Sequence, residues 1–203
     1  AWTLDPTSGW GNYGTQICLK SKLSGALAVP LCGVHEQRIP WLQKYSMRTC
    51  LKLGSDIAAQ IRRARDDEVQ VDFPVLHATD SRLSRTAALW GKANVGLTFF
   101  EGSNISQAAV SKANEFDAVC TGSTWNEAIL RSAGVRNVFK VIQGVDPTIF
   151  HPAPRSENFS NRFVVFSGGK LEYRKGQDIV IAAMRRFCET HPDTLLVTCW
   201  HNH

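Results

Sequence analysis

Apolar runs of strand length alternate with amphipathic segments along the chain, which predicts a parallel β-sheet covered by helices on both faces. The most apolar run of the first half, VGLTFF at residues 95–100, is typical of a strand buried in such a sheet. The pattern predicts strands at residues 27–31, 69–78, 95–100, 116–120, 138–142, 163–166 and 195–200, with the end of another at 1–5. It predicts helices at residues 14–23, 50–65, 84–90, 106–113 and 124–134, and from 178 onward.

Three local signals refine these elements. Pro30 and Pro74 lack the N–H group that a central strand needs, so we expect an edge or a break at each of them. Thr124 is followed three residues later by Glu127, which is the capping-box pattern of a helix start. Gly134 predicts where that helix ends.

A strand, a glycine pair and two lysines predict a phosphate-binding turn in the last part of the chain. The strand at residues 163–166 runs towards Gly168 and Gly169, which allow the backbone to approach a ligand closely. Lys170 and Lys175 follow, just before a helix. Amide donors at a helix start suit a diphosphate, and lysines add positive charge. The alternative is an ordinary basic turn in which both lysines are solvated.

Two motifs in this part of the chain occur in a fixed order. SGGKLEYRKG lies at residues 167–176, and VIQGVDPTIFHP lies at 141–152. Together they resemble GT-B glycosyltransferases of the family 4 type, whose patterns read G-R-L-x-x-x-K-G and V-x-N-G-V-D followed by F-x-P. Lys170 stands where the family has arginine, and Lys175 matches the family lysine. Gln143 replaces the family asparagine, and the matching residues are Gly144, Val145, Asp146, Phe150 and Pro152.

The resemblance implies an α/β protein of the GT-B fold with two Rossmann-like domains. The expected division is an N-terminal acceptor-side domain at residues 1–150, a linker at 151–161, and the start of a nucleotide-sugar-binding domain at 162–203. The family's paired glutamates lie deeper in that second domain, so we expect the chain to be a fragment. The implied activity is hexosyl transfer from a nucleotide-diphosphate sugar to a glycan or a lipid-linked acceptor, with retention of configuration.

The resemblance also assigns roles to residues. The donor diphosphate would be bound by Gly168, Gly169, Lys170 and Lys175. The lysine charge would stabilise the leaving nucleoside diphosphate. Family members often place a histidine after a strand, in contact with the transferred sugar, which makes His77 the candidate catalytic residue. The alternative for His77 is a hydrogen-bonded histidine at a strand end. The donor is a co-substrate, so no cofactor is expected, and the sequence has no metal-ligand signature.

Gly9, Gly11 and Gly14 have the G-x-G-x-x-G spacing of a dinucleotide-binding turn, and Glu36 stands about where such a fold holds a ribose. An NAD(P)-dependent oxidoreductase is therefore the enzyme alternative. However, residues 5–8 separate the expected strand from these glycines, whereas the fingerprint requires glycine directly at the strand end. We prefer the interpretation that the resemblance gives, which is a glycine-rich loop facing the cleft.

Glu101 and Ser123 each follow an expected strand. Ligands of open α/β sheets bind beyond the carboxyl ends of the strands. Both residues are therefore candidates for the acceptor side of the site. Glu101 could instead cap a helix near Asn104.

Composition limits the classes of function. The chain has 203 residues, 43% of them hydrophobic, which is enough for a globular core. Its net charge of +5 favours phosphorylated ligands and allows a peripheral contact with an anionic membrane face. The basic residues are not interleaved with aromatic ones, so we expect no nucleic-acid partner. Six scattered cysteines without a C-x-x-C pair indicate a reduced, cytoplasmic protein. A third alternative is a non-catalytic GT-B-like fragment that binds a nucleotide or a sugar phosphate.

Overall fold

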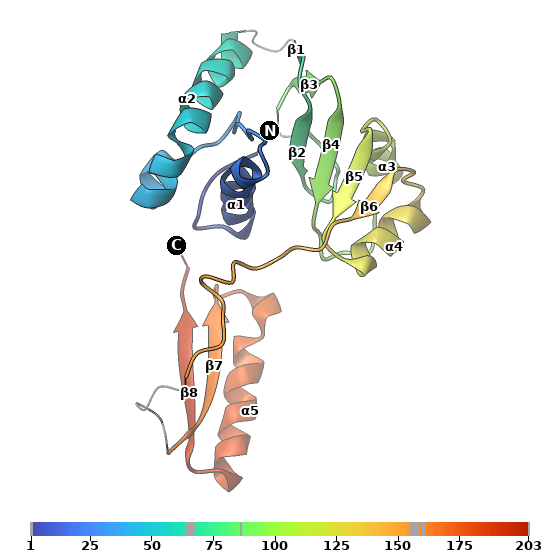
Figure 1. The fold of residues 1–203 in the computed structure, drawn as a ribbon. Helices are drawn as coiled ribbons and strands as arrows, with labels where there is room; N and C mark the ends of the chain where they lie inside the picture. Colours follow the sequence, from blue (N-terminus) through green and yellow to red (C-terminus); the bar gives the residue numbers. More distant parts are fainter. Residues whose placement is uncertain (1, 64–67, 86, 155–158, 160, 203) are drawn as a thin grey trace. The chain divides into compact units, whose positions relative to one another are not determined.

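The structure is a computed structural model that describes residues 2–63, 68–85, 87–154, 159 and 161–202 (Figure 1). The chain forms two compact units, Ala1–Gly144 and Val145–His203. The first unit contains α1 (Gly9–Leu23), η1 (Glu36–Arg38), α2 (Trp41–Arg63), β1 (Val69–Val71), β2 (Val75–Thr79), β3 (Leu89–Gly91), β4 (Asn94–Thr98), α3 (Gln107–Ala113), β5 (Ala118–Thr121), α4 (Thr124–Ala133) and β6 (Val138–Lys140). Among the described helices, none has the length and apolar content needed to cross a membrane.

Four strands of the first unit form one parallel sheet in the order β2-β4-β5-β6, which confirms the predicted parallel α/β architecture. β1 and β3 form a separate parallel pair. Nearer the N-terminus, Leu4 pairs with Val34 through a single parallel bridge. The expected strand at residues 1–5 is thus reduced to one bridge, and residues 27–31 do not form the expected strand.

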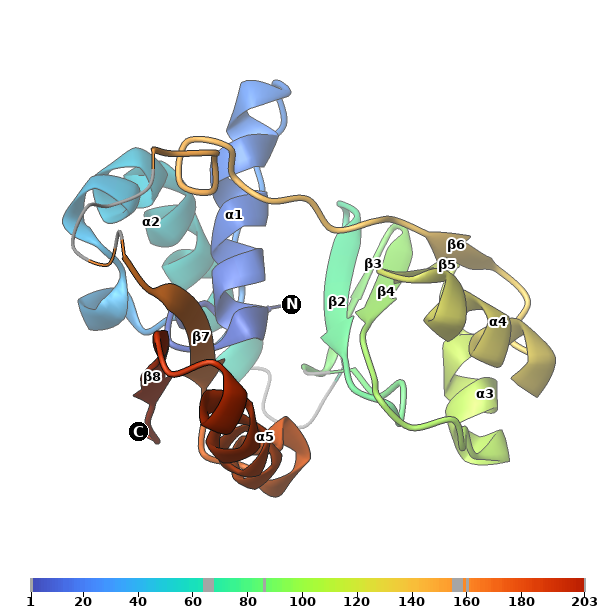
Figure 2. The same ribbon diagram turned by 90° about the horizontal axis from the view of Figure 1, so that it is seen from below.

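Helices cover the sheet on both faces. Figures 1 and 2 show α1 and α2 on one side of the strands and α3 and α4 on the other. The side chains of β5 follow this division, because successive residues of a strand point to opposite faces. Val119 is buried in the core that includes Leu130 of α4, whereas Cys120 packs on the core that includes Met47 of α2.

Several predicted elements differ from the structure in extent or type. The predicted strand at residues 69–78 is divided into β1 and β2, and the break expected at Pro74 is confirmed. The helix expected at residues 84–90 is wrong, because Leu89 begins β3 and is fully buried. α2 begins at Trp41, earlier than predicted, and its expected end at Arg65 lies outside the described residues.

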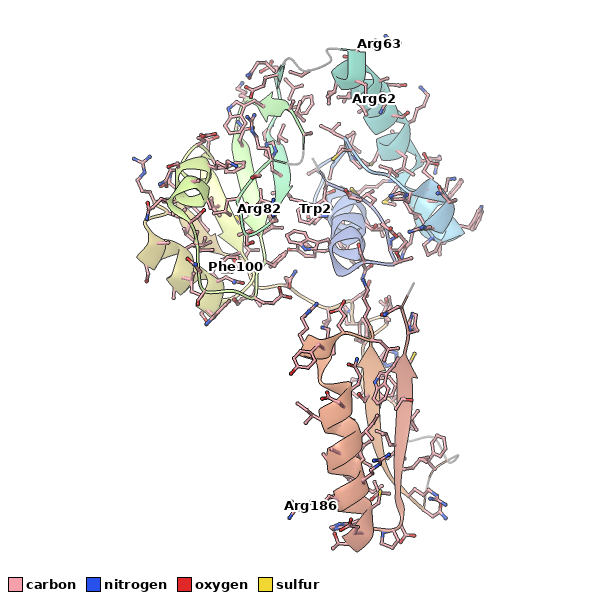
Figure 3. All side chains as sticks on the ribbon, turned by 180° about the vertical axis from the view of Figure 1, so that it is seen from behind. Trp2, Arg62, Arg63, Arg82, Phe100 and Arg186 are labelled. Carbon is pink, nitrogen blue, oxygen red and sulfur yellow. The ribbon has the colours of Figure 1, made fainter. Side chains whose placement is uncertain are left out.

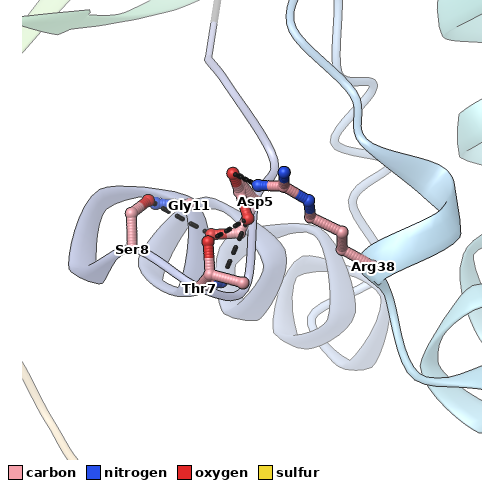
Figure 4. Close-up of polar contacts among 5 residues, drawn as sticks. All are labelled: Asp5, Thr7, Ser8, Gly11 and Arg38. Carbon is pink, nitrogen blue, oxygen red and sulfur yellow. Dashed lines mark hydrogen bonds and ion pairs between the residues drawn. The ribbon is translucent and has the colours of Figure 1, made fainter. Parts of the chain in front are cut away.

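The start of α1 is fixed by a compact set of polar contacts (Figure 4). Ser8 is the N-cap, and its hydroxyl accepts a hydrogen bond from the Gly11 amide at 3.0 Å. Asp5 accepts hydrogen bonds from the amide and the hydroxyl of Thr7, at 3.1 and 2.7 Å. Arg38 completes the set with an ion pair to Asp5 at 2.8 Å. These contacts start the helix at Gly9, five residues before the predicted start.

The second unit is a strand–helix–strand arrangement. It consists of β7 (Phe163–Gly169), η3 (Tyr173–Lys175), α5 (Gln177–Thr190) and β8 (Thr194–Trp200). β7 and β8 pair in parallel along their whole length, from Phe163 opposite Thr194 to Gly169 opposite Trp200. The sequence predicts this order of elements, but β7 is longer than expected and includes both glycines of the predicted phosphate turn.

Candidate functional site

A pocket of about 470 Å³ opens at the carboxyl ends of β2 and β4. Residues 78–81, 99–102 and Asn104 line it from the strand ends, and Trp2, Thr3 and Trp10 line it from the N-terminal segment and α1. Helices lie on both sides of this sheet, α1 and α2 on one and α3 and α4 on the other (Figure 2). A crevice beyond the carboxyl ends of parallel strands is the usual ligand site of an open α/β sheet.

One wall of this pocket is aromatic. The rings of Trp2 and Trp10 are 5.4 Å apart, and Trp10 lies 4.9 Å from Phe99. Tyr13 supports both sides of the cluster, at 5.7 Å from Trp2 and 5.6 Å from Phe99. The indole N–H of Trp2 donates to the backbone oxygen of Trp10 at 2.8 Å, so its polar edge is satisfied. These ring contacts fix the positions of the aromatic side chains in the wall.

The opposite wall is polar and comes from the two loops that follow β2 and β4. Asp80, Ser81, Glu101 and Asn104 line it with exposed side chains. The loop after β2 is anchored by the Thr98 hydroxyl, which donates to the backbone oxygen of Asp80 at 3.1 Å. The loop after β4 is anchored in the same way by Asn126 of α4, whose buried side-chain amide donates to the backbone oxygen of Phe100 at 2.9 Å.

This combination of groups suits a polyhydroxylated ligand. Carboxylates accept hydrogen bonds from hydroxyl groups, and Ser81 and Asn104 can both donate and accept. Flat aromatic surfaces pack against the C–H faces of such a ligand. Glu101 lies in this pocket, as its position after a strand predicts. Sequence reasoning missed the aromatic wall, although Trp2 and Trp10 on either side of the predicted strand end were a usable signal.

Ser123 has a structural contact that accounts for its position. It is the N-cap of α4, one residue earlier than the predicted capping box at Thr124. Its hydroxyl accepts from the Asn126 amide at 3.0 Å and donates to the Asn126 side-chain oxygen at 3.0 Å. Ser123 does not line the strand-end pocket, and its acceptor-side role stays a prediction.

His77 is the central residue of β2 rather than a residue at the strand end. Its side chain is fully buried, with the ring 5.8 Å from Trp90 and 5.4 Å from Phe116. Its Nε2 lies 3.2 Å from Oδ1 of Asn94, and this oxygen also accepts the Gly91 amide at 2.8 Å. The shared oxygen can only accept, so Nε2 carries the proton. The predicted catalytic placement is therefore corrected: His77 does not line the pocket.

Burial lowers the pKa of His77 to about 4, from 6.5. The buried Nδ1 atom has no hydrogen-bond partner among the described residues, so a proton there would have no acceptor. Because the folded pKa lies below the unfolded one, the unfolded chain binds the proton first as the pH falls. The contribution of His77 to the free energy of unfolding is therefore complete above pH 6.5 and decreases as the pH falls towards 4.

We expect the free energy of unfolding to fall by about 1.4 kcal/mol per pH unit in this window because of His77. Urea unfolding of the wild type and of His77→Gln, followed across the window, measures this contribution. In His77→Gln, the number of protons taken up on unfolding in this window should be smaller by close to one, and the slope of the free energy of unfolding with pH should be smaller accordingly. An unchanged pH dependence in His77→Gln would show that other groups account for the slope.

The glycines of the G-x-G-x-x-G spacing lie inside α1, which corrects the prediction of a loop. A Cβ atom on Gly11 would collide with the backbone of Asp5, and one on Gly14 would collide with the indole of Trp2. Both glycines therefore allow the N-terminal segment to cross close to the helix. Gly9 has open space around it. Packing against the segment before the helix accounts for Gly11 and Gly14, whereas no such contact accounts for Gly9.

The predicted phosphate turn has a defined shape in the second unit. Gly169, at the end of β7, has a φ of +133°, and Gly176, before α5, has a φ of +64°. Both values favour glycine. The Gln177 side chain donates to the backbone oxygen of Lys170 at 2.6 Å, which ties the turn to the helix start. Lys170 and Lys175 are both exposed, whereas Gly168 pairs with Cys199 of β8 inside the strand pair.

The helix after this turn begins at Gln177, with Gly176 as its N-cap and without a side-chain hydrogen bond at the cap. Amide groups of a first turn that is not capped by a side chain are available to an anion. Lys170, Lys175 and the start of α5 thus belong to one short turn. The described residues contain no group of three or more His, Cys, Asp or Glu side chains that could hold a metal ion.

Comparison of the chain with protein-family models, with curated proteins and with solved structures gave no match.

Proposed function

We propose that the protein is a glycosyltransferase that moves a sugar from a nucleotide-diphosphate sugar to a hydroxyl-bearing acceptor. The turn between β7 and α5 carries the proposal. It joins a parallel strand to a helix whose N-cap is a glycine, and it presents Lys170 and Lys175. A helix start and lysine side chains can bind a diphosphate through its charged oxygens. Such binding requires no contact with the base or the sugar of the donor.

The chemistry assigned to this turn is stabilisation of charge. During transfer, the bond between the anomeric carbon and the β-phosphate oxygen breaks, and the acceptor oxygen forms a new bond to that carbon while its proton passes to the departing diphosphate. The electron pair of the broken bond remains on the nucleoside diphosphate. Lys170 and Lys175 would stabilise this charge as it develops, which is the kind of electrostatic effect that contributes most to many enzymes. The proposal includes retention of the anomeric configuration, and only the family resemblance supports this part of it.

The strand-end pocket of the first unit is the proposed acceptor site. Its aromatic wall and its polar side chains suit the faces and hydroxyl groups of a glycan. Asp80 and Glu101 are the carboxylates that can accept from the acceptor hydroxyl groups.

Lys175→Ala is expected to weaken binding of UDP or GDP roughly tenfold or more, because a hydrogen bond to a charged group contributes about 1.5–3 kcal/mol. Arg186→Ala is the matched control, since Arg186 is an exposed cation farther along α5 (Figure 3). Isothermal titration of both variants with each nucleotide measures the difference. Equal effects of the two substitutions would remove Lys175 from the diphosphate site.

Two alternatives to a glycosyltransferase predict different results in the same titration. Nucleotide binding that depends on Lys175, without transfer to any acceptor, would favour a non-catalytic nucleotide-binding protein. Binding of NAD(P) but not of UDP or GDP would favour an oxidoreductase. The packing of Gly11 and Gly14 against Asp5 and Trp2 speaks against the second alternative, because those glycines are already in contact with the chain itself.

A further inference from the structure

A second cavity of the first unit has a different chemical character from the strand-end pocket. It has a volume of about 390 Å³ and lies between α1, α2, residues 27–31 and the start of β2. Trp2 lines both cavities and is a shared wall. For comparison, an apolar cavity of about 150 Å³ is large enough to hold benzene. The cavity described here therefore has room for a considerably longer hydrocarbon.

The lining of this cavity is predominantly apolar. None of the described residues that line it has a charged side chain, and most of them are leucine, isoleucine, valine, alanine, proline or aromatic residues. The one ionisable group is Cys18, and burial raises the pKa of its thiol to about 11, so the thiol is neutral. A cavity of this kind does not hold ordered water well, because water needs two or more polar partners there.

The cavity is accessible from solvent, and its rim is apolar as well. Leu27 is 52% exposed, Leu53 of α2 is 41% exposed and Phe73 is 37% exposed, and all three line it. Apolar side chains that remain exposed around an apolar recess usually mark a binding site. A rim without charge favours an uncharged chain over a carboxylate or a phosphate at the entrance.

We propose that this cavity binds a single unbranched alkyl chain, of a free fatty compound or of a lipid. The chain would lie between α1 and α2, with Leu27, Leu53 and Phe73 around its entrance. Binding removes apolar surface of both partners from water, which is the driving force. The inference does not depend on the glycosyltransferase proposal, because it concerns a separate cavity and a ligand of another class.

A series of n-alcohols tests the proposal on the intact chain. Titration calorimetry with octanol, decanol and dodecanol, each below its solubility limit, should show one saturable site. Each added CH₂ group is expected to tighten binding about fourfold, the factor equivalent to ~0.8 kcal/mol. Absence of saturable binding by all three alcohols would overturn the proposal.

Two pairs of variants locate the site. Leu53→Trp should fill the entrance and reduce dodecanol affinity at least tenfold, whereas Leu42→Trp, at a 67% exposed position of the same helix, should leave it unchanged. Leu27→Asp should place a charge at the rim and weaken binding, whereas Leu23→Asp, at an 80% exposed position outside the lining, should not. The four positions are exposed, so folding should survive, and circular dichroism confirms it. Equal affinity within both pairs would overturn the assignment to this cavity.

Vesicles of neutral phosphatidylcholine distinguish the two sources of the chain. Flotation with vesicles that is lost in Leu53→Trp and in the presence of dodecanol would identify a chain drawn from a bilayer. Dodecanol binding without flotation would identify a free fatty compound. Flotation that persists in Leu53→Trp, together with no dodecanol site, would show that the protein associates with membranes through another surface and would overturn the proposal.

Discussion

Alanine in place of Asn94 is expected to lower the free energy of unfolding by about 5 kcal/mol, because three buried polar groups lose their partner at once. The side-chain oxygen of Asn94 accepts from the Gly91 amide at 2.8 Å and from His77 Nε2 at 3.2 Å. Its side-chain amide donates to the Gly91 oxygen at 2.8 Å. Each buried group left without a partner costs about 1–3 kcal/mol.

Denaturant unfolding of Asn94→Ala measures this loss directly. Asn137→Ala is the control, since Asn137 is exposed beside β6 and a surface change of this kind is usually within about 0.5 kcal/mol. A small change in stability for Asn94→Ala would mean that water or a rearranged side chain replaces the lost hydrogen bonds.

Gly11→Ala is expected to lower the free energy of unfolding by roughly 4 kcal/mol, above the 1–3 kcal/mol usual for an overpacked core. The reason for the larger value is that the new methyl group meets the backbone of Asp5, which cannot move aside as a flexible side chain can. The same collision would disturb the contacts between Asp5, Thr7 and Arg38 that fix the start of α1.

Gly9→Ala is the matched control in the same helix. An added Cβ atom at Gly9 meets nothing within 4 Å, so this variant should be more stable than the wild type by about 0.5 kcal/mol. Thermal unfolding of the two variants, with NAD(P) titrated into each, separates the two explanations of the glycine spacing. A stable Gly11→Ala variant with altered NAD(P) binding would restore the nucleotide-turn interpretation.

The parts of the fold that sequence predicts well are those whose local pattern and tertiary environment agree. β4 and α3 lie where the apolar run at residues 95–100 and the segment at 106–113 indicate. Ser106 caps α3 with a hydrogen bond to Ala109, so the local signal and the structure coincide there. The break at Pro74 is also predictable, because proline lacks a ladder donor.

The predictions from sequence are wrong where tertiary packing determines the secondary structure or the environment of a residue. The segment at residues 84–90 has a pattern compatible with a helix, but Leu89 and Trp90 pack into the sheet and the residues form β3. His77 follows three residues after Pro74 in an apolar run, and sequence alone does not reveal that it lies in mid-strand facing Phe116. No local signal distinguishes a buried histidine paired with a remote asparagine from one that contacts a ligand.

The candidate site shows the same division. The positions of Glu101 after β4 and of Lys170 and Lys175 between β7 and α5 can be predicted from sequence, because a polar residue that follows a strand lies at the edge of the sheet to which that strand belongs. The roles of these three residues stay predictions. The aromatic wall cannot be found in this way, because it joins Trp2 to Phe99 across nearly half of the chain. The glycine spacing at the start of α1 misleads for a related reason: the partner that requires those glycines is the crossing segment before the helix.

The contact of Trp10 with Phe99, which closes the aromatic cluster that also contains Trp2, determines when the first unit can become compact during synthesis. Until Phe99 has left the ribosome, the two indole rings lack the partner that closes their cluster. β2 likewise has no partner in the four-stranded sheet before β4 emerges. The nascent chain therefore exposes an aromatic surface while about half of its length is made, which is the condition under which chaperones engage a growing polypeptide.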